Sequence, residues 1–346
     1  MEKQLTHEYF MHRCLQIAEN GRQAAMPNPC VGAVIVFQNR IIGEGYTSAF
    51  GGPHGEVNAL RSVAEQDTPL LPESTLYVSL EPCSHYGKTP PCADLIVSHK
   101  IPHVVIGTTD PNPLVAGNGI RKLKEAGIQV TTGILEKECQ WSLRRFLISV
   151  QNKRPFITLK WAESSNHKIA QIDGTPVHIT SSSTRVLTHK LRAEHQSILC
   201  GWKTILHDQP ALNNRLWVGE SPQVIVLDLH QKLNNHSYFQ TKSDWWRIVA
   251  GKPDRSNDII TDDTSLQNIL QLLYQKGIQS IFVEGGSYTH QQFIDAGLWD
   301  ECYIYRGKIN IPNGKAAPCL SHAVLNTSYC LENDLIQIFS PEVIHE

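Results

Sequence analysis

The sequence predicts an α/β protein of two domains. Strand-like and helix-like patterns alternate along both halves of the chain, which is typical of a mostly parallel sheet packed against helices. The length of 346 residues exceeds one ordinary domain and suits two. A polar segment that ends in proline, 151–155, separates the halves. We therefore expect one domain at residues 1–150 and a second at 151–346.

The first half opens with an amphipathic helix, in which Tyr9, Cys14 and Ile17 recur at helical spacing. Short apolar runs then indicate strands, and the first two form a hairpin around the turn at 38–40. In chain order we expect a helix at 6–20, strands at 31–36 and 41–45, a helix at 54–65, a strand at 75–80, a helix at 92–99 and a strand at 103–107.

The second half repeats this alternation after a helix at 135–150. The expected strands are 156–161, 197–200, 223–229, 247–250, 280–283 and 301–305. The expected helices are 187–195, 265–277 and 289–297.

Composition excludes several classes of protein. Lys and Arg total 31 against 33 Asp and Glu, so the net charge of −2 argues against binding nucleic acid through bulk charge. No apolar run approaches the roughly 20 residues of a membrane span, and the first twenty residues lack a secretory pattern. Nine cysteines cannot all pair as disulfides. We expect a cytoplasmic protein whose His and Cys serve metal binding or catalysis.

The motif that most strongly indicates a reactive site is His54-Gly-Glu56, followed by Pro-Cys83 and Pro-Cys92. One imidazole and two thiolates provide three zinc ligands and leave a fourth position for water, whose pKa the metal lowers. Glu56 then takes and returns the proton. This order of residues is typical of hydrolytic zinc deaminases. The alternatives are unrelated core and loop residues, or a structural zinc with a fourth protein ligand such as His85.

Eight residues separate Cys83 from Cys92, where nucleobase deaminases usually have two. This longer loop, together with 27–32 and 110–119, closely resembles the bifunctional riboflavin-biosynthesis deaminase/reductase family, over essentially the whole chain. The resemblance implies a cytidine-deaminase-like α/β/α sandwich followed by a dihydrofolate-reductase-like α/β domain. It also implies Zn²⁺ on His54, Cys83 and Cys92, with Glu56 as the proton shuttle. The deaminase substrate contacts that it implies are Asn28, His85, Lys88, Asp110 and Asn112.

The second half resembles the reductase partner of this family at 159–162, 190–195, 201–210, 282–286 and 296–301, and at Leu212 and Arg215. The resemblance implies that NADPH contacts Ala162, Thr204, Asp208, Gly285 and Gly286. It implies that a ribose-phosphate substrate contacts Arg192, Leu212, Arg215 and Glu284. Glycines between a strand and a helix let the backbone approach a pyrophosphate, and Arg suits bidentate phosphate binding.

The chain departs from the family pattern in both halves. In the deaminase half, Thr47 replaces a His and Gly55 replaces an Ala. In the reductase half, Asn166 and His167 replace Asp-Gly, Pro176 replaces a substrate-binding Ser and His178 replaces a cofactor-facing Trp. These changes leave open a deaminase whose reductase-like domain is inactive or only binds substrate.

The function that the resemblance implies has two steps in riboflavin biosynthesis. The first is hydrolytic deamination of 2,5-diamino-6-ribosylamino-4(3H)-pyrimidinone 5′-phosphate. The second is NADPH-dependent reduction of the ribosyl group of 5-amino-6-(5-phosphoribosylamino)uracil to ribityl. The expected partners are a small phosphorylated pyrimidine and further copies of the chain, with no nucleic acid and no membrane. A cytidine or tRNA deaminase is disfavoured by the eight-residue gap and the near-neutral charge.

Overall fold

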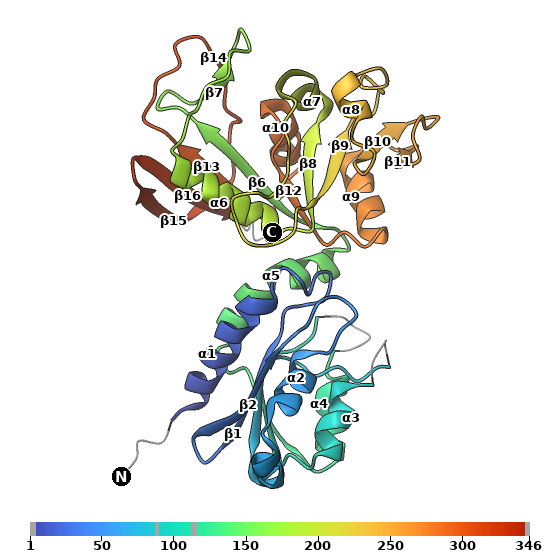
Figure 1. The fold of residues 1–346 in the computed structure, drawn as a ribbon, viewed down its shortest axis with the longest axis vertical. Coiled ribbons are helices and arrows are strands. Elements are labelled where there is room, and N and C mark those ends of the chain that lie inside the picture. The colour runs from blue at the N-terminus through green and yellow to red at the C-terminus, as the bar shows by residue number, and fades with distance from the viewer. Residues whose placement is uncertain (1–4, 87–89, 112–115, 343–346) are drawn as a thin grey trace. The chain divides into compact units, whose positions relative to one another are not determined.

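The computed structural model describes residues 5–86, 90–111 and 116–342. The chain divides into two compact units, Met1–Lys153 and Arg154–Glu346 (Figure 1). No helix within the described residues is both long and apolar enough to cross a membrane. Each unit has its own large sheet and its own hydrophobic core.

The first unit contains a five-stranded sheet of order β2-β1-β3-β4-β5. The strands are β1 Gly32–Phe37, β2 Arg40–Tyr46, β3 Thr75–Leu80, β4 His103–Thr108 and β5 Gln129–Thr132. The hairpin of β1 and β2 is confirmed. The mostly parallel sheet is also confirmed, with one exception: β1 pairs antiparallel with both β2 and β3, so it runs against the other four strands, which share one direction.

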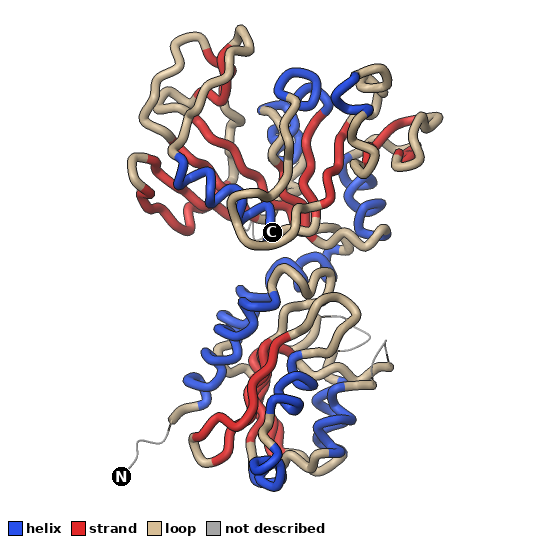
Figure 2. Tube along the Cα trace, viewed as in Figure 1, coloured by secondary structure: helices blue, strands red, loops and turns tan. Residues whose placement is uncertain are grey.

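Helices cover both faces of this sheet, as Figure 2 shows. They are α1 His7–Ala18, α2 Gly55–Ser62, α3 Cys92–Ser98, α4 Asn118–Glu125 and α5 Glu136–Asn152, with short 3₁₀ helices at Glu19–Gly21 and Glu65–Glu73. Alternate residues of β1 enter opposite cores, since Ala33 packs with α2, α3 and α4, and Val34 packs with α1. Residues 151–152, expected in a linker, continue α5 instead.

The edge strand β2 holds α2 in place. The Glu44 N–H donates to Ser62 Oγ at 2.8 Å, and Asn58 Nδ2 donates to Tyr46 O at 2.8 Å. The helix also lies close to the strand, because a Cβ at Gly45 would come within 2.2 Å of Ala59 N. These contacts hold α2 against the sheet, and the predicted site residues His54 and Glu56 lie at the start of this helix.

The second unit contains a nine-stranded sheet of order β11-β10-β9-β8-β12-β6-β13-β16-β15. Its strands are β6 Phe156–Glu163, β8 Ser197–Gly201, β9 Gln223–Leu227, β10 Trp246–Ala250, β11 Asp258–Thr261, β12 Ser280–Val283, β13 Glu301–Arg306, β15 Ala323–Leu331 and β16 Asp334–Pro341. The first seven strands in this order run parallel, and β16 and β15 are added antiparallel. A separate pair joins β7 Lys168–Gln171 to β14 Gly314–Ala316.

Helices pack on both faces of this sheet as well. They are α6 Ser182–Ala193, α7 Trp202–Asp208, α8 Ser237–Gln240, α9 Leu266–Gln275 and α10 Ser287–Asp295. Residues of α6, α7 and α8 share a core with Ile198, whereas residues of α9 and α10 share a core with Leu199. Since neighbouring strand residues point to opposite faces, α7 and α10 cover opposite sides of the sheet.

Candidate functional site

Three residues from separate segments meet at the carboxyl end of β3. His54 precedes α2 in an extended conformation, Cys83 follows β3, and Cys92 is the first residue of α3. His54 Nδ1 lies 3.6 Å from Cys83 Sγ and 3.4 Å from Cys92 Sγ. All three ligand atoms lie within 4.8 Å of one another. The predicted zinc ligands are therefore brought together, whereas the exposed His85 is not in this cluster.

The geometry and charge of this cluster fit zinc. Tetrahedral bonds of about 2.3 Å to sulfur and about 2.1 Å to nitrogen place ligand atoms roughly 3.5–3.8 Å apart. Hydrogen bonds from Cys92 and His54 lower the pKa of Cys83 to about 4, while the same pairing raises the pKa of Cys92. The Cys92 backbone N–H, at the start of α3, also donates to Cys83 Sγ at 3.3 Å. The cluster thus supports a thiolate before any metal binds.

Glu56 lies in the first turn of α2 and is only 3% exposed. Burial, and then the charge of Cys83, raise the pKa of Glu56 to about 7. A buried carboxyl beside the three predicted zinc ligands is well placed to exchange protons with a molecule that reacts there.

The two departures in this half have structural reasons. A Cβ at position 55 would lie 2.7 Å from Val31 O, so the alanine that the family usually has would require the backbone of this chain to shift there. Thr47 is buried, and its Oγ1 accepts the Val31 N–H at 3.0 Å. Both residues therefore contact the backbone of Val31, which follows Asn28 in the chain, and Thr47 holds that backbone by a hydrogen bond.

The predicted substrate contacts of this half are only partly described. Asn28 and Asp110 are half-buried, and His85 is exposed. Lys88 and Asn112 lie outside the described residues. The Asp110 N–H donates to the carboxylate of Glu81 at 3.3 Å, a contact that sequence reasoning missed.

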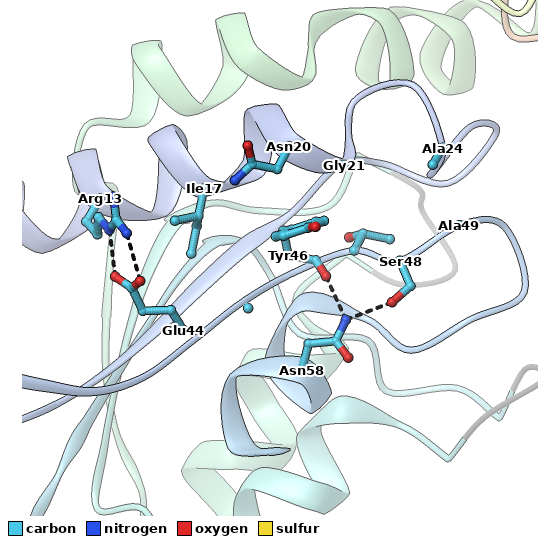
Figure 3. A pocket seen from close by; sticks show the side chains of 12 residues that line it. Arg13, Ile17, Asn20, Gly21, Ala24, Glu44, Tyr46, Ser48, Ala49 and Asn58 are labelled. Carbon is cyan, nitrogen blue, oxygen red and sulfur yellow. Dashed lines mark hydrogen bonds and ion pairs between the residues drawn. The ribbon is translucent and has the colours of Figure 1, made fainter. Parts of the chain in front are cut away.

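A cavity of about 570 Å³ opens on the same unit between α1, β2 and α2 (Figure 3). Its walls include the Arg13–Glu44 ion pair, and Asn58, which bonds to Ser48 Oγ at 2.8 Å. Neither the zinc cluster nor Glu56 is among its lining residues. The polar groups of Arg13, Glu44 and Asn58 are already paired within the protein, so this cavity is not the reactive centre.

In the second unit, the predicted glycine turn lies between β12 and α10. Gly285 packs against the end of β8, because a Cβ there would lie 2.7 Å from both Cys200 Cα and Gly201 N. Gly286 is exposed and has room for a Cβ, whose nearest neighbour would be Thr204 Oγ1 at 3.5 Å. The Gly286 N–H donates to Thr204 Oγ1 at 3.1 Å. Three predicted NADPH contacts thus meet at one place, and Gly286 is the glycine open to a ligand.

A charged group lies nearby at the end of β12. Arg192 and Glu284 form a two-bonded ion pair and are each 11% exposed. Burial alone would raise the pKa of Glu284, but the charges of Arg192 and Lys160 outweigh it and lower that pKa. Lys160 on β6 was missed as a site residue. The signal was a single charged residue within the strand expected at 156–161.

Two further residues complete this polar group. The Arg215 N–H donates to His189 Nδ1 at 3.1 Å, and the exposed Arg215 guanidinium bonds to Asn213 Oδ1 at 2.8 Å. Burial, and then Arg192 and Arg215, lower the pKa of His189 to about 4, so its ring is neutral near pH 7. Leu212 has a positive φ of 50° and packs its side chain in the core.

The remaining predicted cofactor contacts lie on neighbouring elements of this unit. Ala162 is half-buried on β6, and Asp208 is the exposed last residue of α7.

The departures of this half alter the turn between β6 and β7. Asn166 Nδ2 donates to Ile311 O at 3.0 Å, a bond that the usual Asp has no hydrogen to make. His167 has a φ of 57°, a conformation that glycine adopts easily, which explains why the family usually has glycine at this position. The Nδ1 atom of His167 lies 2.9 Å from Glu163 Oε1. Pro176 and His178 are exposed. The turn is therefore held by side-chain bonds of Asn166 and His167.

Comparisons with known proteins agree with this arrangement. Residues 4–108 match the cytidine and deoxycytidylate deaminase zinc-binding region, and residues 155–309 match the RibD C-terminal domain. The riboflavin biosynthesis protein RibD of Bacillus amyloliquefaciens is 38% identical over 328 residues, covering 90% of this chain and 87% of that protein. RibD of Escherichia coli is 35% identical, covering 86% of each chain.

A solved structure covers still more of the chain. It is a diaminohydroxyphosphoribosylaminopyrimidine deaminase/5-amino-6-(5-phosphoribosylamino)uracil reductase from Thermotoga maritima, 35% identical with a TM-score of 0.87. The match covers 97% of this chain and 98% of that one.

Proposed function

Because the chain belongs to the RibD family of riboflavin-biosynthesis proteins, it is a bifunctional deaminase and reductase, and we propose how its halves divide the chemistry. Residues 1–150 remove the 2-amino group of the diaminopyrimidine ribosyl phosphate by hydrolysis. Residues 151–346 then reduce the ribosyl group of the deaminated product to ribityl with NADPH. These are the substrates in the name of the Thermotoga maritima protein.

The observation that carries the deaminase assignment is the cluster of His54, Cys83 and Cys92 beside the buried Glu56. Zinc held by these three side chains supplies a Lewis acid that activates water at neutral pH. Glu56 would accept one proton of the attacking water and give it to a ring nitrogen, and would then take the second proton, from the added hydroxyl, and give it to the amino group, which leaves as ammonia. We assign substrate binding to Asn28, His85, Lys88, Asp110 and Asn112.

The topology of the second sheet supports NADPH binding between β8 and β12. These strands are neighbours, but the chain leaves β8 toward β9 on one side and leaves β12 toward β13 on the other. In parallel sheets, ligands bind at such a divergence, beyond the carboxyl ends of the strands. Gly285, Gly286 and Thr204 lie at this point. A dinucleotide there meets the amino end of α10, with Ala162 and Asp208 on adjacent elements.

The polar group beside this point supports a phosphorylated substrate. In this proposal the ribose-phosphate substrate contacts Arg192, Leu212, Arg215 and Glu284, and Arg215 contributes an exposed guanidinium. Lys160 adds a second cation within the interaction range of Glu284. The nicotinamide and the ribosyl carbon need close alignment more than they need a protein acid or base.

We also propose a cytoplasmic homo-oligomer. All nine cysteines are free thiols, which suits a reducing compartment. The strand β15 is the end of the nine-stranded sheet, and seven of its nine residues are exposed. Residues 316–331 contain no charged side chain. Long edges without charge readily pair with another chain, so β15 suits contact with a second copy.

The experiment is to supply the diaminopyrimidine phosphate to the zinc-loaded protein with and without NADPH, and to identify products by mass. We expect the deaminated ribosyl compound without NADPH and the ribityl compound with it. A chelator should abolish the first product while leaving reduction of separately supplied deaminated compound. NADPH that is not oxidised by the deaminated compound would establish the alternative of a deaminase with an inactive reductase-like domain.

A further inference from the structure

Glu81 lies between β3 and Cys83 and accepts hydrogen bonds from Asp110 and from the start of α4. It follows β3 directly, two residues before Cys83, and is 4% exposed. Its carboxylate accepts four backbone N–H groups from one distant segment. Oε2 accepts from Asp110 at 3.3 Å and Gly117 at 3.0 Å, and Oε1 accepts from Gly119 at 2.9 Å and Ile120 at 3.2 Å.

These bonds provide a helix cap from another part of the chain. The helix α4 begins at Asn118, and its N-cap residue Gly117 has no side chain to accept the first N–H groups. Those N–H groups are normally satisfied by a side chain at the N-cap. Here Glu81 accepts them, and its negative charge lies at the positive end of the helix.

The same segment lies tightly against the residue before Cys83. A Cβ at Gly119 would come within 2.0 Å of Pro82 O and 3.2 Å of Glu81 Oε1. Glu81 also donates its own N–H to Thr108 O at 2.9 Å, at the end of β4. One side chain therefore joins the segment between β3 and Cys83 to both Asp110 and the start of α4.

A carboxylate has about four acceptor sites, and the four N–H groups occupy them. Glu81 is therefore neither a proton shuttle nor a metal ligand, although it lies only two residues before Cys83. We propose that Glu81 is a positioning residue of the deaminase, which sets Asp110 and the amino end of α4 relative to the zinc ligands. This inference rests on the proposed deaminase function and on the substrate role of Asp110.

The test is Glu81→Gln in the full zinc-loaded chain, assayed with the diaminopyrimidine phosphate. The amide has the size of the carboxylate but offers one oxygen, so two N–H groups lose their acceptor and face a donor. We expect KM to rise about 10- to 100-fold, as for one or two lost hydrogen bonds, with kcat changed far less. The zinc content and the reductase rate should equal those of the wild type.

The matched control is Glu44→Gln, which breaks the Arg13–Glu44 ion pair in the same unit and should leave KM unchanged. A second variant, Gly119→Ala, displaces the same segment while retaining Glu81, and should reproduce the rise in KM. In the wild type, the amides of Gly119 and Ile120 should exchange hydrogen slowly, unlike those of an uncapped first turn.

Three outcomes would overturn the proposal: an unchanged KM in Glu81→Gln, loss of zinc from that variant, or rapid exchange of the Gly119 and Ile120 amides in the wild type. The exchange measurement stands even if a variant does not fold. Failure of the proposed function is recognised separately, because the wild-type chain would then release no ammonia.

Discussion

Arg192 and Glu284 face each other through two hydrogen bonds, Nε to Oε1 at 2.9 Å and Nη2 to Oε2 at 2.6 Å. Arg192 Nη1 donates in addition to Asn213 O at 2.8 Å. Three nitrogens of the Arg192 guanidinium therefore already donate hydrogen bonds within the protein, and the charge of Glu284 offsets its positive charge. Of the two arginines expected to bind a phosphate, Arg215 is the more available.

Replacing Arg215 with Gln should therefore weaken substrate binding by the reductase. Loss of a charge-assisted hydrogen bond costs about 1.5–3 kcal/mol, so KM for the phosphorylated substrate should rise by roughly 10- to 150-fold. NADPH oxidation at varied substrate concentration measures this change. The control is Arg185→Gln, an exposed arginine in the first turn of α6. Equal KM values for the two variants would contradict the assignment.

Substitution of Gly285 should lower the stability of the protein, whereas substitution of the adjacent Gly286 should weaken NADPH binding. In Gly285→Ala the new Cβ meets backbone atoms at 2.7 Å, so unfolding should become easier by about 1–3 kcal/mol. In Gly286→Ala the nearest atom is at 3.5 Å, so the thermal midpoint should change little while Kd for NADPH increases. Thermal unfolding and NADPH titration of both variants check this. An unchanged Kd in Gly286→Ala would exclude close approach of the cofactor at that residue.

His189 should make the second unit less stable in acid. Its folded pKa is about 4, below the ordinary value of 6.5, so the unfolded chain binds a proton before the folded chain does. Stability present above pH 6.5 is therefore lost as the pH falls from about 6.5 toward 4. In His189→Gln the amide oxygen still accepts an N–H but does not titrate, so this variant should lose less stability over the same range.

Urea midpoints at pH 7 and pH 5 measure the difference. The exposed His178→Gln serves as the control and should follow the wild type. Parallel loss of stability in all three proteins would refute a role for His189.

Glu56→Gln should abolish most of the deamination. Loss of a general acid–base group typically lowers the rate by 10²- to 10⁴-fold, measured here as ammonia release. Zinc content should be retained because Glu56 is not in the ligand cluster, and reduction of the deaminated compound should continue. Glu65→Gln, an exposed carboxyl beyond α2, should be fully active. Unchanged ammonia release would remove Glu56 from the mechanism.

Secondary structure was predictable where the hydrophobic pattern is strong. The strand expected at 75–80 is β3, Thr75–Leu80. In contrast, β15 was missed because seven of its nine residues are exposed, and no alternating pattern marks the strand. The helix α4 was also missed. Its eight residues include three basic ones, and its cap comes from Glu81, a partner distant in sequence.

The same distinction applies to the sites. His54, Glu56, Cys83 and Cys92 form a motif whose chemistry depends on residue type and order, so the zinc cluster could be predicted. The contacts of Glu81 could not, because its four donors are backbone groups 29 to 39 residues away. Backbone N–H groups have no sequence signature, and only the fold brings them together.

The two large sheets share no strand among the described residues. Each half therefore builds its reactive groups from its own strands and helices, and the compound passed between them is a small molecule. In genetic terms, alleles damaged in different halves should complement each other. A cell carrying one copy without Glu56 and another without the Arg215 guanidinium would still make the vitamin, so selection can act on the halves separately although they are translated as one chain.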